Sequence, residues 1–195
     1  MALPAAVCDA GDGNGGGDRR GTERASGGDG GGLLAALPMT SDLPTEYTIV
    51  ADVAPVKGLN GSGYSAGVTF QQTDGTQFYH FRLDHGVKAS SQLLRWPDKN
   101  SAVAPPAKHE TEVKDGQAYR LRVTVSGEKM IGYVDSVKQF EYDASAAGGK
   151  VGLRVYNAVA LFDNIAVYSG VVAPEGAEQA ENLTLAGTTP EIKDP

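Results

Sequence analysis

Apolar and polar residues alternate along most of the chain between residues 46 and 170, with the two-residue period of a β-strand. In residues 47–53, one face carries Tyr47, Ile49, Ala51 and Val53. Similar segments cover residues 64–72, 77–84, 92–96, 119–125, 130–135, 150–156 and 160–168. No segment of useful length has a helical period. Roughly seven or eight strands with short turns predict an all-β fold in which two antiparallel sheets pack as a sandwich.

The most informative segment surrounds Asp74 and Gly75. Asp-Gly between two alternating runs is the strongest short-range signal for a β-hairpin. A two-residue turn here pairs Thr73 with Thr76 and sets one apolar face, with the pairs Phe70–Tyr79, Val68–Phe81 and Ala66–Leu83. The opposite face then carries the pairs Gln71–Phe78, Thr69–His80, Gly67–Arg82 and Ser65–Asp84. A shift by one residue would exchange the faces, so the agreement of both strands supports this register.

Both ends of the chain differ from the middle. Residues 1–32 contain 11 of the 26 glycines and few large apolar side chains, so we expect residues 1–41 to form a flexible tether. Residues 171–195 are acidic and rich in Pro and Glu, which is typical of a disordered tail or linker. One sandwich domain is therefore expected over residues 42–170. Of the net charge of −7, the two ends supply −6 and this domain −1.

The composition excludes several classes of protein. The chain has no block of Lys and Arg, so we expect no nucleic-acid partner, and it has no apolar run long enough to span a membrane. Its single cysteine, Cys8, excludes an internal disulfide and a cysteine-based zinc site. Ala5-Ala6-Val7-Cys8 before the Gly/Asp run resembles a bacterial lipoprotein cleavage site, which would anchor the chain through lipid on Cys8. Val7 departs from that pattern, and the alternative is an incidental exposed thiol.

Several segments together resemble the concanavalin A-like lectin/glucanase superfamily. They are YRLRV and GEKMIGYVD within residues 119–135, GKVGLRVY over residues 149–156 and FDNIAV over residues 162–167, with SAGVTF and YHFRL upstream. Laminin-G-like and keto-disaccharide-hydrolase-type domains are the nearest in pattern. The resemblance covers residues 46–170 and implies a jelly roll with an extracellular, periplasmic or cell-surface location. Such domains normally begin with a further strand, which only residues 33–39 could supply here.

The resemblance also implies that one sheet holds an oligo- or polysaccharide on a polar face. The polar face predicted from the hairpin suits this role, because Arg82 offers fixed donors, His80 a donor and an acceptor, and Phe78 a ring for the C–H face of a sugar. The candidate site residues are Thr69, Gln71, Phe78, His80, Arg82, Asp84 and Trp96. The alternatives are an ordinary solvated face on which Arg82 pairs with Asp84, and a Trp96 packed in the core or at its rim.

Two further pairs could extend the polar face. Arg122 faces Tyr133 if the second hairpin turns at Gly127-Glu128, and Arg154 and Tyr156 lie near the last strand. The alternative is that these long side chains cover apolar surface. Asp163 and Asn164 are expected to fix a turn or bulge, and calcium has no ligand cluster to support it.

Catalytic motifs are incomplete. A glucanase of this fold needs two carboxylates on one strand face, and the laminarinase-type Glu-x-Asp-x-x-Glu pattern lacks its last Glu at residues 141–146. The Gln-x-His of alginate lyases is absent at residues 77–80. We therefore predict no catalytic residues, metal or cofactor, and a lectin-like carbohydrate-binding module of a secreted or surface-anchored protein. A glycoside hydrolase related to keto-disaccharide hydrolases and a laminin-G-like protein-interaction domain stay as alternatives.

Overall fold

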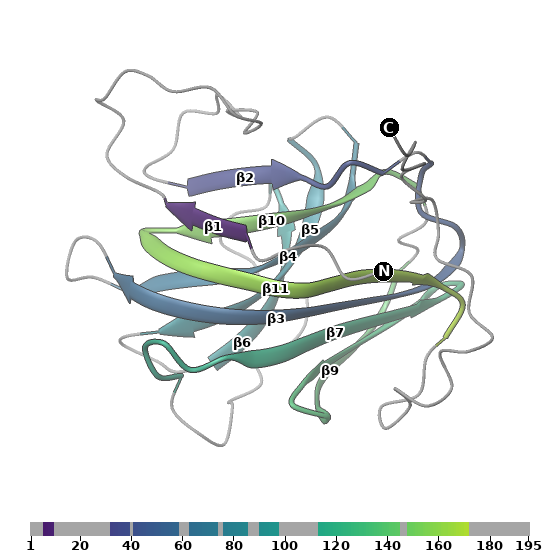
Figure 1. Ribbon diagram of the computed structural model, residues 1–195. Helices are drawn as coiled ribbons and strands as arrows, with labels where there is room; N and C mark the ends of the chain where they lie inside the picture. The colour runs from purple at the N-terminus through teal and green to yellow at the C-terminus, as the bar shows by residue number, and fades with distance from the viewer. Residues whose placement is uncertain are drawn as a thin grey trace, which may run out of the picture.

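The structure is a computed structural model of the whole chain (Figure 1), and it describes residues 6–9, 32–39, 41–58, 63–73, 76–85, 90–97, 113–144 and 148–171. This part of the chain is built from strands alone, as the alternation predicts, so the all-β fold is confirmed. The strands are β1 (Ala6–Asp9), β2 (Gly32–Ala36), β3 (Glu46–Gly58), β4 (Tyr64–Gln72), β5 (Phe78–His85), β6 (Ser90–Trp96), β7 (Tyr119–Ser126), β8 (Lys129–Val134), β9 (Val137–Asp143), β10 (Lys150–Tyr156) and β11 (Ala158–Ser169). Within the described ranges, no helix is long and apolar enough to cross a membrane.

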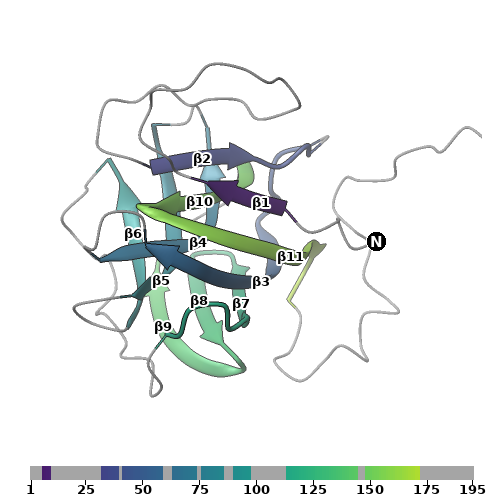
Figure 2. The same ribbon diagram turned by 60° about the vertical axis from the view of Figure 1, so that its left-hand side comes forward.

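The strands form two antiparallel sheets that pack face to face. The six-stranded sheet has the order β1-β11-β3-β7-β8-β9, and the five-stranded sheet has the order β2-β10-β4-β5-β6. In Figure 1 the strands β11, β3 and β7 lie in front of β4, β5 and β6, and Figure 2 shows the same two layers after a turn. This arrangement confirms the predicted two-sheet sandwich.

The apolar faces of both sheets form the core between them. Phe81 of β5 is fully buried and its ring meets the ring of Phe140 of β9 edge-on, with the centroids 5.0 Å apart. The ring of Tyr79 of β5 lies tilted against that of Tyr142 of β9, with 59° between the planes and 6.4 Å between the centroids. The last strand of the six-stranded sheet therefore packs against the fourth strand of the other sheet, which closes one side of the sandwich.

The first hairpin has the predicted register. Phe70 lies opposite Tyr79 with their rings stacked 5.5 Å apart, and the pairing continues without a break to Tyr64 opposite His85. The pairs Thr69–His80, Gly67–Arg82 and Ser65–Asp84 all form, as expected for the opposite face. Phe78 and His80 are not part of the core cluster, so the assignment of the two faces is confirmed.

The hairpin differs from the prediction near its turn. The ladder ends at Phe70–Tyr79, so the expected pair of Gln71 with Phe78 is wrong. Gln71 has a positive φ of 54°, and the pairing of β4 with β10 shifts register at the same place. Gly149 explains this irregularity, because a Cβ on it would lie 2.7 Å from the carbonyl carbon of Gln71. The two turn residues at positions 74 and 75 lie outside the described residues.

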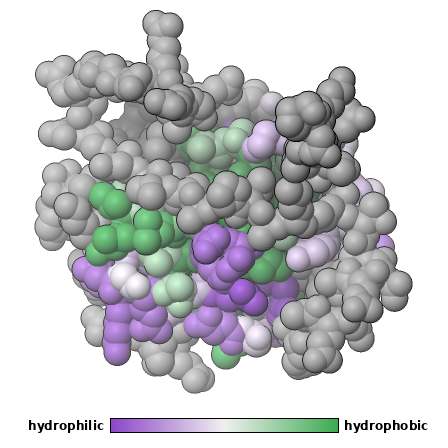
Figure 3. Space-filling model, viewed as in Figure 1, coloured by the Kyte–Doolittle hydropathy of each residue, from purple (hydrophilic) through white to green (hydrophobic). Residues whose placement is uncertain are grey.

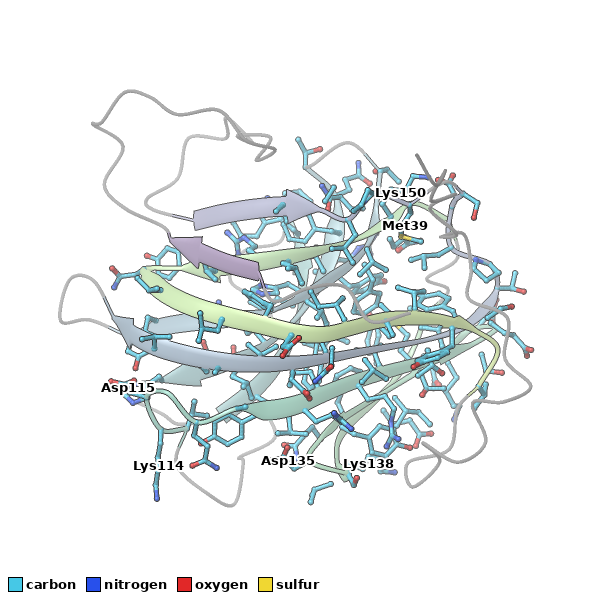
Figure 4. The ribbon with its side chains drawn as sticks, viewed as in Figure 1. Met39, Lys114, Asp115, Asp135, Lys138 and Lys150 are labelled. Atoms are coloured by element: carbon cyan, nitrogen blue, oxygen red, sulfur yellow. The ribbon has the colours of Figure 1, made fainter. Side chains whose placement is uncertain are left out.

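The N-terminal region contributes an edge strand to each sheet. Ala6–Asp9 pairs with β11, and Gly32–Ala36 pairs with β10, so both strands fall within the region expected to be a tether. Leu37 and Met39 then pack against the core, and the amide of Val151 donates to Met39 Sδ at 3.2 Å. Figure 4 shows Met39 beside Lys150 at the start of β10. The strand β2, which covers most of the apolar part of residues 33–39, thus supplies the additional strand that the resemblance requires. Residues 1–5, 10–31, 40 and 172–195 of the predicted tether and tail lie outside the described residues.

A polar network covers part of the six-stranded sheet. Arg120 donates two hydrogen bonds to Asp52, at 2.8 and 3.0 Å, and Asn164 Nδ2 donates to the same carboxylate at 2.7 Å. Asn164 has a φ of 48° and lies where the pairing of β11 with β3 shifts, so the predicted bulge at Asp163 and Asn164 is confirmed. Figure 3 shows hydrophilic side chains in the middle and lower part of this side of the molecule. The polar side chains of this network bind one another through the Arg120–Asp52 ion pair and the hydrogen bonds to Asp52.

The second hairpin pairs Arg122 with Tyr133, as predicted, and the Arg122 guanidinium lies 4.3 Å from the centre of the tyrosine ring. Both residues belong to the six-stranded sheet. They therefore do not extend the polar face of the first hairpin, which belongs to the other sheet.

Candidate functional site

The candidate site is the outer face of the five-stranded sheet, which is the face directed away from the core. The antiparallel pairing arranges its side chains in rows across β10, β4, β5 and β6, because residues directly opposite one another share a face. One row is Gly152, Thr69, His80 and Leu94, and the next is Arg154, Gly67, Arg82 and Gln92. Phe78 and Trp96 form a third row. Most of the predicted site residues are therefore neighbours.

Arg82 is held by two partners on this face. Its Nε lies 3.0 Å from Asp84 Oδ1, and its Nη2 donates to Gln92 Oε1 at 3.2 Å. The two charged side chains are only 22% and 19% exposed. A guanidinium fixed in this way presents its remaining donors in one orientation, as a site for hydroxyl or carboxylate oxygens requires.

Two aromatic rings and a second arginine lie beside this group. The rings of Phe78 and Trp96 are nearly parallel, with 4° between their planes and 5.8 Å between their centroids. The guanidinium carbon of Arg154 lies 4.6 Å from the centre of the Trp96 ring and 5.8 Å from that of Phe78. Trp96 therefore packs on the outer face, and it is not part of the core cluster.

The contact between Arg154 and Trp96 shows how the face is shaped. Arg154 belongs to β10 and Trp96 to β6, and β4 and β5 lie between these strands. The two side chains can meet only if they cross above β4 and β5, so the small or buried side chains of those strands lie beneath them. Thr69 and His80 are accordingly 0% and 1% exposed. The alternative of an ordinary solvated face is thus wrong for the middle of this sheet, although the pairing of Arg82 with Asp84 that it included is confirmed.

His80 is a buried polar side chain without a hydrogen-bond partner for either ring nitrogen among the described residues. Burial lowers its pKa well below the usual value, and the charges of Arg154 and Arg82 act in the same direction. The ring is therefore neutral near pH 7, with one nitrogen able to donate and one to accept. The hydroxyl of Thr69, its partner across the hairpin, also lacks a partner there.

Burial shifts the pKa values of both Asp84 and Arg154 on this face. Burial raises the pKa of Asp84 to about 6, although the nearby Arg82 guanidinium acts in the opposite direction. Burial lowers the pKa of Arg154 to about 10, and the positive charge of Arg82 adds to this effect. Charge here is poorly solvated, and the one ion pair of Asp84 with Arg82 compensates only part of it.

The raised pKa of Asp84 predicts a pH-dependent stability. The folded protein binds this proton more strongly than the unfolded chain does, so protonation stabilises the fold below about pH 4, and the contribution is lost as the pH rises through about 6. Relative to the Asp84→Asn variant, the wild type should lose up to roughly 3 kcal/mol between pH 4 and pH 7. Urea unfolding of both proteins at several pH values measures this difference.

Asp143→Asn is the matched control, because that carboxylate is 83% exposed. Other titrating groups are common to all three proteins and cancel in each comparison with the wild type. A difference between wild type and Asp84→Asn that stays constant from pH 4 to pH 7 would contradict the burial of charge at Asp84.

The sequence identified most of this face but missed part of it. Thr69, Phe78, His80, Arg82, Asp84 and Trp96 lie together, whereas Gln71 lies in the irregular end of β4. Gln92 was missed because its place depends on the register of β5 with β6, and a four-residue loop with one glycine over residues 86–89 indicates a hairpin without fixing that register. Arg154 was named as an extension of the face, and its register opposite Gly67 places it there.

Carboxylates suited to catalysis are not brought together in the described part of the chain. Asp84 lies on the outer face of the five-stranded sheet, whereas Glu141 lies on β9 of the other sheet and forms ion pairs with Lys129 and Lys138. No group of three or more His, Cys, Asp or Glu residues that could hold a metal occurs in those ranges.

Known structures share this architecture at low sequence identity. No family model and no curated protein matches the sequence. The carbohydrate-binding module CBM66 from Bacillus subtilis superposes with a TM-score of 0.59 and 20% identity, covering 71% of this chain and 83% of that one. The alginate lyase AlgAT5 of polysaccharide lyase family 7 gives 0.58 and 14%, covering 86% and 78%. A Bacillus subtilis protein of unknown function with a galectin-like fold gives 0.55 and 12%, covering 74% and 80%.

These similarities agree with the two-sheet sandwich described above. The superpositions show a shared fold. At identities of 20% and below, they do not show that these proteins bind the same ligand. The chain has the concanavalin A-like jelly-roll fold.

Proposed function

We propose that this domain binds a saccharide on the outer face of the five-stranded sheet. The observation that carries the proposal is the convergence of flat aromatic rings with fixed donors and acceptors on one surface. Trp96 supplies a half-buried ring that the buried Phe78 ring supports by stacking, and the Arg82–Asp84–Gln92 group supplies oriented polar atoms. Sugars are bound by this combination, because their hydroxyl groups need hydrogen bonds and their C–H faces pack on rings.

The descriptions of two known structures with this fold support the proposal. One is a carbohydrate-binding module and another acts on alginate, a polysaccharide. A binding module of a secreted or surface-anchored protein is the role that fits this chain best. Lipidation of Cys8, which lies in β1, stays a prediction of the sequence.

The binding test compares Arg82→Ala with the parent chain. A glycan array first identifies the saccharides that the parent binds, and titration calorimetry then measures their affinities. Arg82→Ala should weaken binding by about 1–3 kcal/mol, because it removes oriented donors and leaves their partners unsatisfied. It should also lower the unfolding temperature, since Asp84 loses its ion-pair partner.

Arg95→Ala is the matched control. Arg95 precedes Trp96 in β6, is exposed, and pairs with Tyr79 of the core-facing row, so it points to the other side of the sheet. This change should leave affinity unaltered. If Arg82→Ala binds every glycan as the parent does and only its unfolding temperature falls, Arg82 has a structural role and the proposal fails.

A further inference from the structure

We propose that the saccharide is acidic and that Arg154 binds its carboxylate. This inference rests on the proposed function and specifies the class of its ligand. It starts from the charges on the outer face of the five-stranded sheet. Arg82 and Arg154 contribute two positive charges, and Asp84 is the carboxylate that faces them from the described strands. Asp84 is paired with Arg82, so the charge of Arg154 is left over.

Arg154 makes contacts that do not satisfy its donors. Its guanidinium packs on the rings of Trp96 and Phe78, and it forms no ion pair with a described residue. Stacking on a ring occupies the flat face of a guanidinium and leaves the N–H groups in its plane available. A carboxylate approaches a guanidinium in that plane and accepts two parallel hydrogen bonds. The ring contact therefore holds Arg154 ready for such a ligand.

The neighbours of Arg154 leave space and polar groups for the ligand. Gly67 lies between Arg154 and Arg82 in the same row and has no side chain. In the adjacent row, Thr69 and His80 have buried polar atoms that lack partners among the described residues. Both side chains are at most 1% exposed, so they form a polar floor beneath Arg154, and a ligand oxygen meets the Arg154 guanidinium first. The unpaired charge and the unpaired neutral groups thus lie side by side.

Burial makes an anionic ligand more favourable than a neutral one. Arg154 is half-buried, and a cation without a counterion in such a place is poorly solvated. A neutral sugar would cover this charge without compensating it, whereas a carboxylate would pair with it. The planar, bidentate geometry favours a uronic acid, and a sulfate ester offers the same negative charge without the planar match.

The test uses oligosaccharides that differ only in charge. Trisaccharides of galacturonate, glucuronate and mannuronate are each titrated as the free acid and as the methyl ester, with a sulfated galactan oligosaccharide and neutral cello-oligosaccharides as further arms. For at least one uronate, the parent chain should bind the acid roughly 10–100-fold more tightly than its ester. The preference should diminish at high salt, since part of it is electrostatic.

Arg154→Gln tests the assigned residue. The planar amide keeps much of the packing on Trp96 but carries no charge, so the ratio of acid to ester affinity should fall toward one while binding of the ester persists. Arg95→Gln, on the other side of the sheet, should keep the parent's ratio. An unchanged ratio in Arg154→Gln, with the variant folded by circular dichroism, overturns the role of Arg154.

The remaining outcomes separate this inference from the proposed function. Equal affinity for every acid and its ester, or a preference for neutral oligosaccharides, overturns the acidic ligand while saccharide binding stands. A preference confined to the sulfated oligosaccharide overturns the carboxylate. Binding of no saccharide in any arm overturns the proposed function together with the inference.

Discussion

Replacing Phe81 with alanine should lower the free energy of unfolding by about 3–5 kcal/mol, the usual cost of removing a buried aromatic ring. Phe81 is fully buried, and its ring meets Phe140 of the opposite sheet at 5.0 Å. The substitution leaves a cavity where the two sheets contact each other, so the loss includes both buried area and packing. Urea unfolding followed by circular dichroism measures it.

Phe81→Leu is the matched control, because a leucine fills most of the same volume and should cost clearly less. The neighbouring Arg82→Ala provides a second comparison, since that side chain lies on the other face of the same strand. A loss below about 1 kcal/mol for Phe81→Ala would show that Phe81 is not in the core, and the predicted faces of the hairpin would then be wrong.

The register of the first hairpin could be predicted because it is local. Each strand alternates with a period of two, and the two alternations agree only in one register. The irregular end at Gln71 could not be predicted, because it reflects the close approach of Gly149, which is about 80 residues away in the sequence. Sequence patterns describe the faces of a strand well and say little about contacts between distant strands.

The edge strands show another limit of the pattern. Ala6–Asp9 and Gly32–Ala36 pair through backbone hydrogen bonds, which every residue except proline can donate and accept. Such pairing does not require an alternating run of large apolar residues. The glycine-rich composition therefore gave no sign of the strand at Ala6–Asp9, whereas the apolar run over residues 33–39 had marked the second one as a possible strand.

The candidate site depends on the order of strands, which is not local. Arg154 joins the predicted hairpin only because β10 lies next to β4, and Gln92 only because β6 lies next to β5. The hairpin alone placed His80, Arg82 and Asp84 together correctly. It could not show that Arg154 and Trp96 meet above β4 and β5, and therefore it left a solvated face open as an alternative.

Gly67 connects the packing of this sheet with its site. It pairs with Arg154 on one side and with Arg82 on the other, and it lies close against the backbone of β5. A Cβ at this position would lie 2.1 Å from the carbonyl oxygen of Phe81 and 2.6 Å from Cα of Arg82. These are backbone atoms, so no side-chain rotation can relieve the contact, and the two strands would have to separate.

Gly67→Ala should therefore lower the free energy of unfolding by about 3 kcal/mol or more, at the upper end for a small-to-large change. The stiffer unfolded chain of an alanine variant offsets only about 0.4–1 kcal/mol of this. Because the separation displaces Arg82, affinity for any saccharide ligand should fall with stability. Gly63→Ala is the matched control, since its Cβ would lie 3.4 Å from the nearest atom, an ordinary contact. Urea unfolding compares the two variants, and equal stabilities would show that β4 and β5 are not packed as closely at Gly67 as the structure has them.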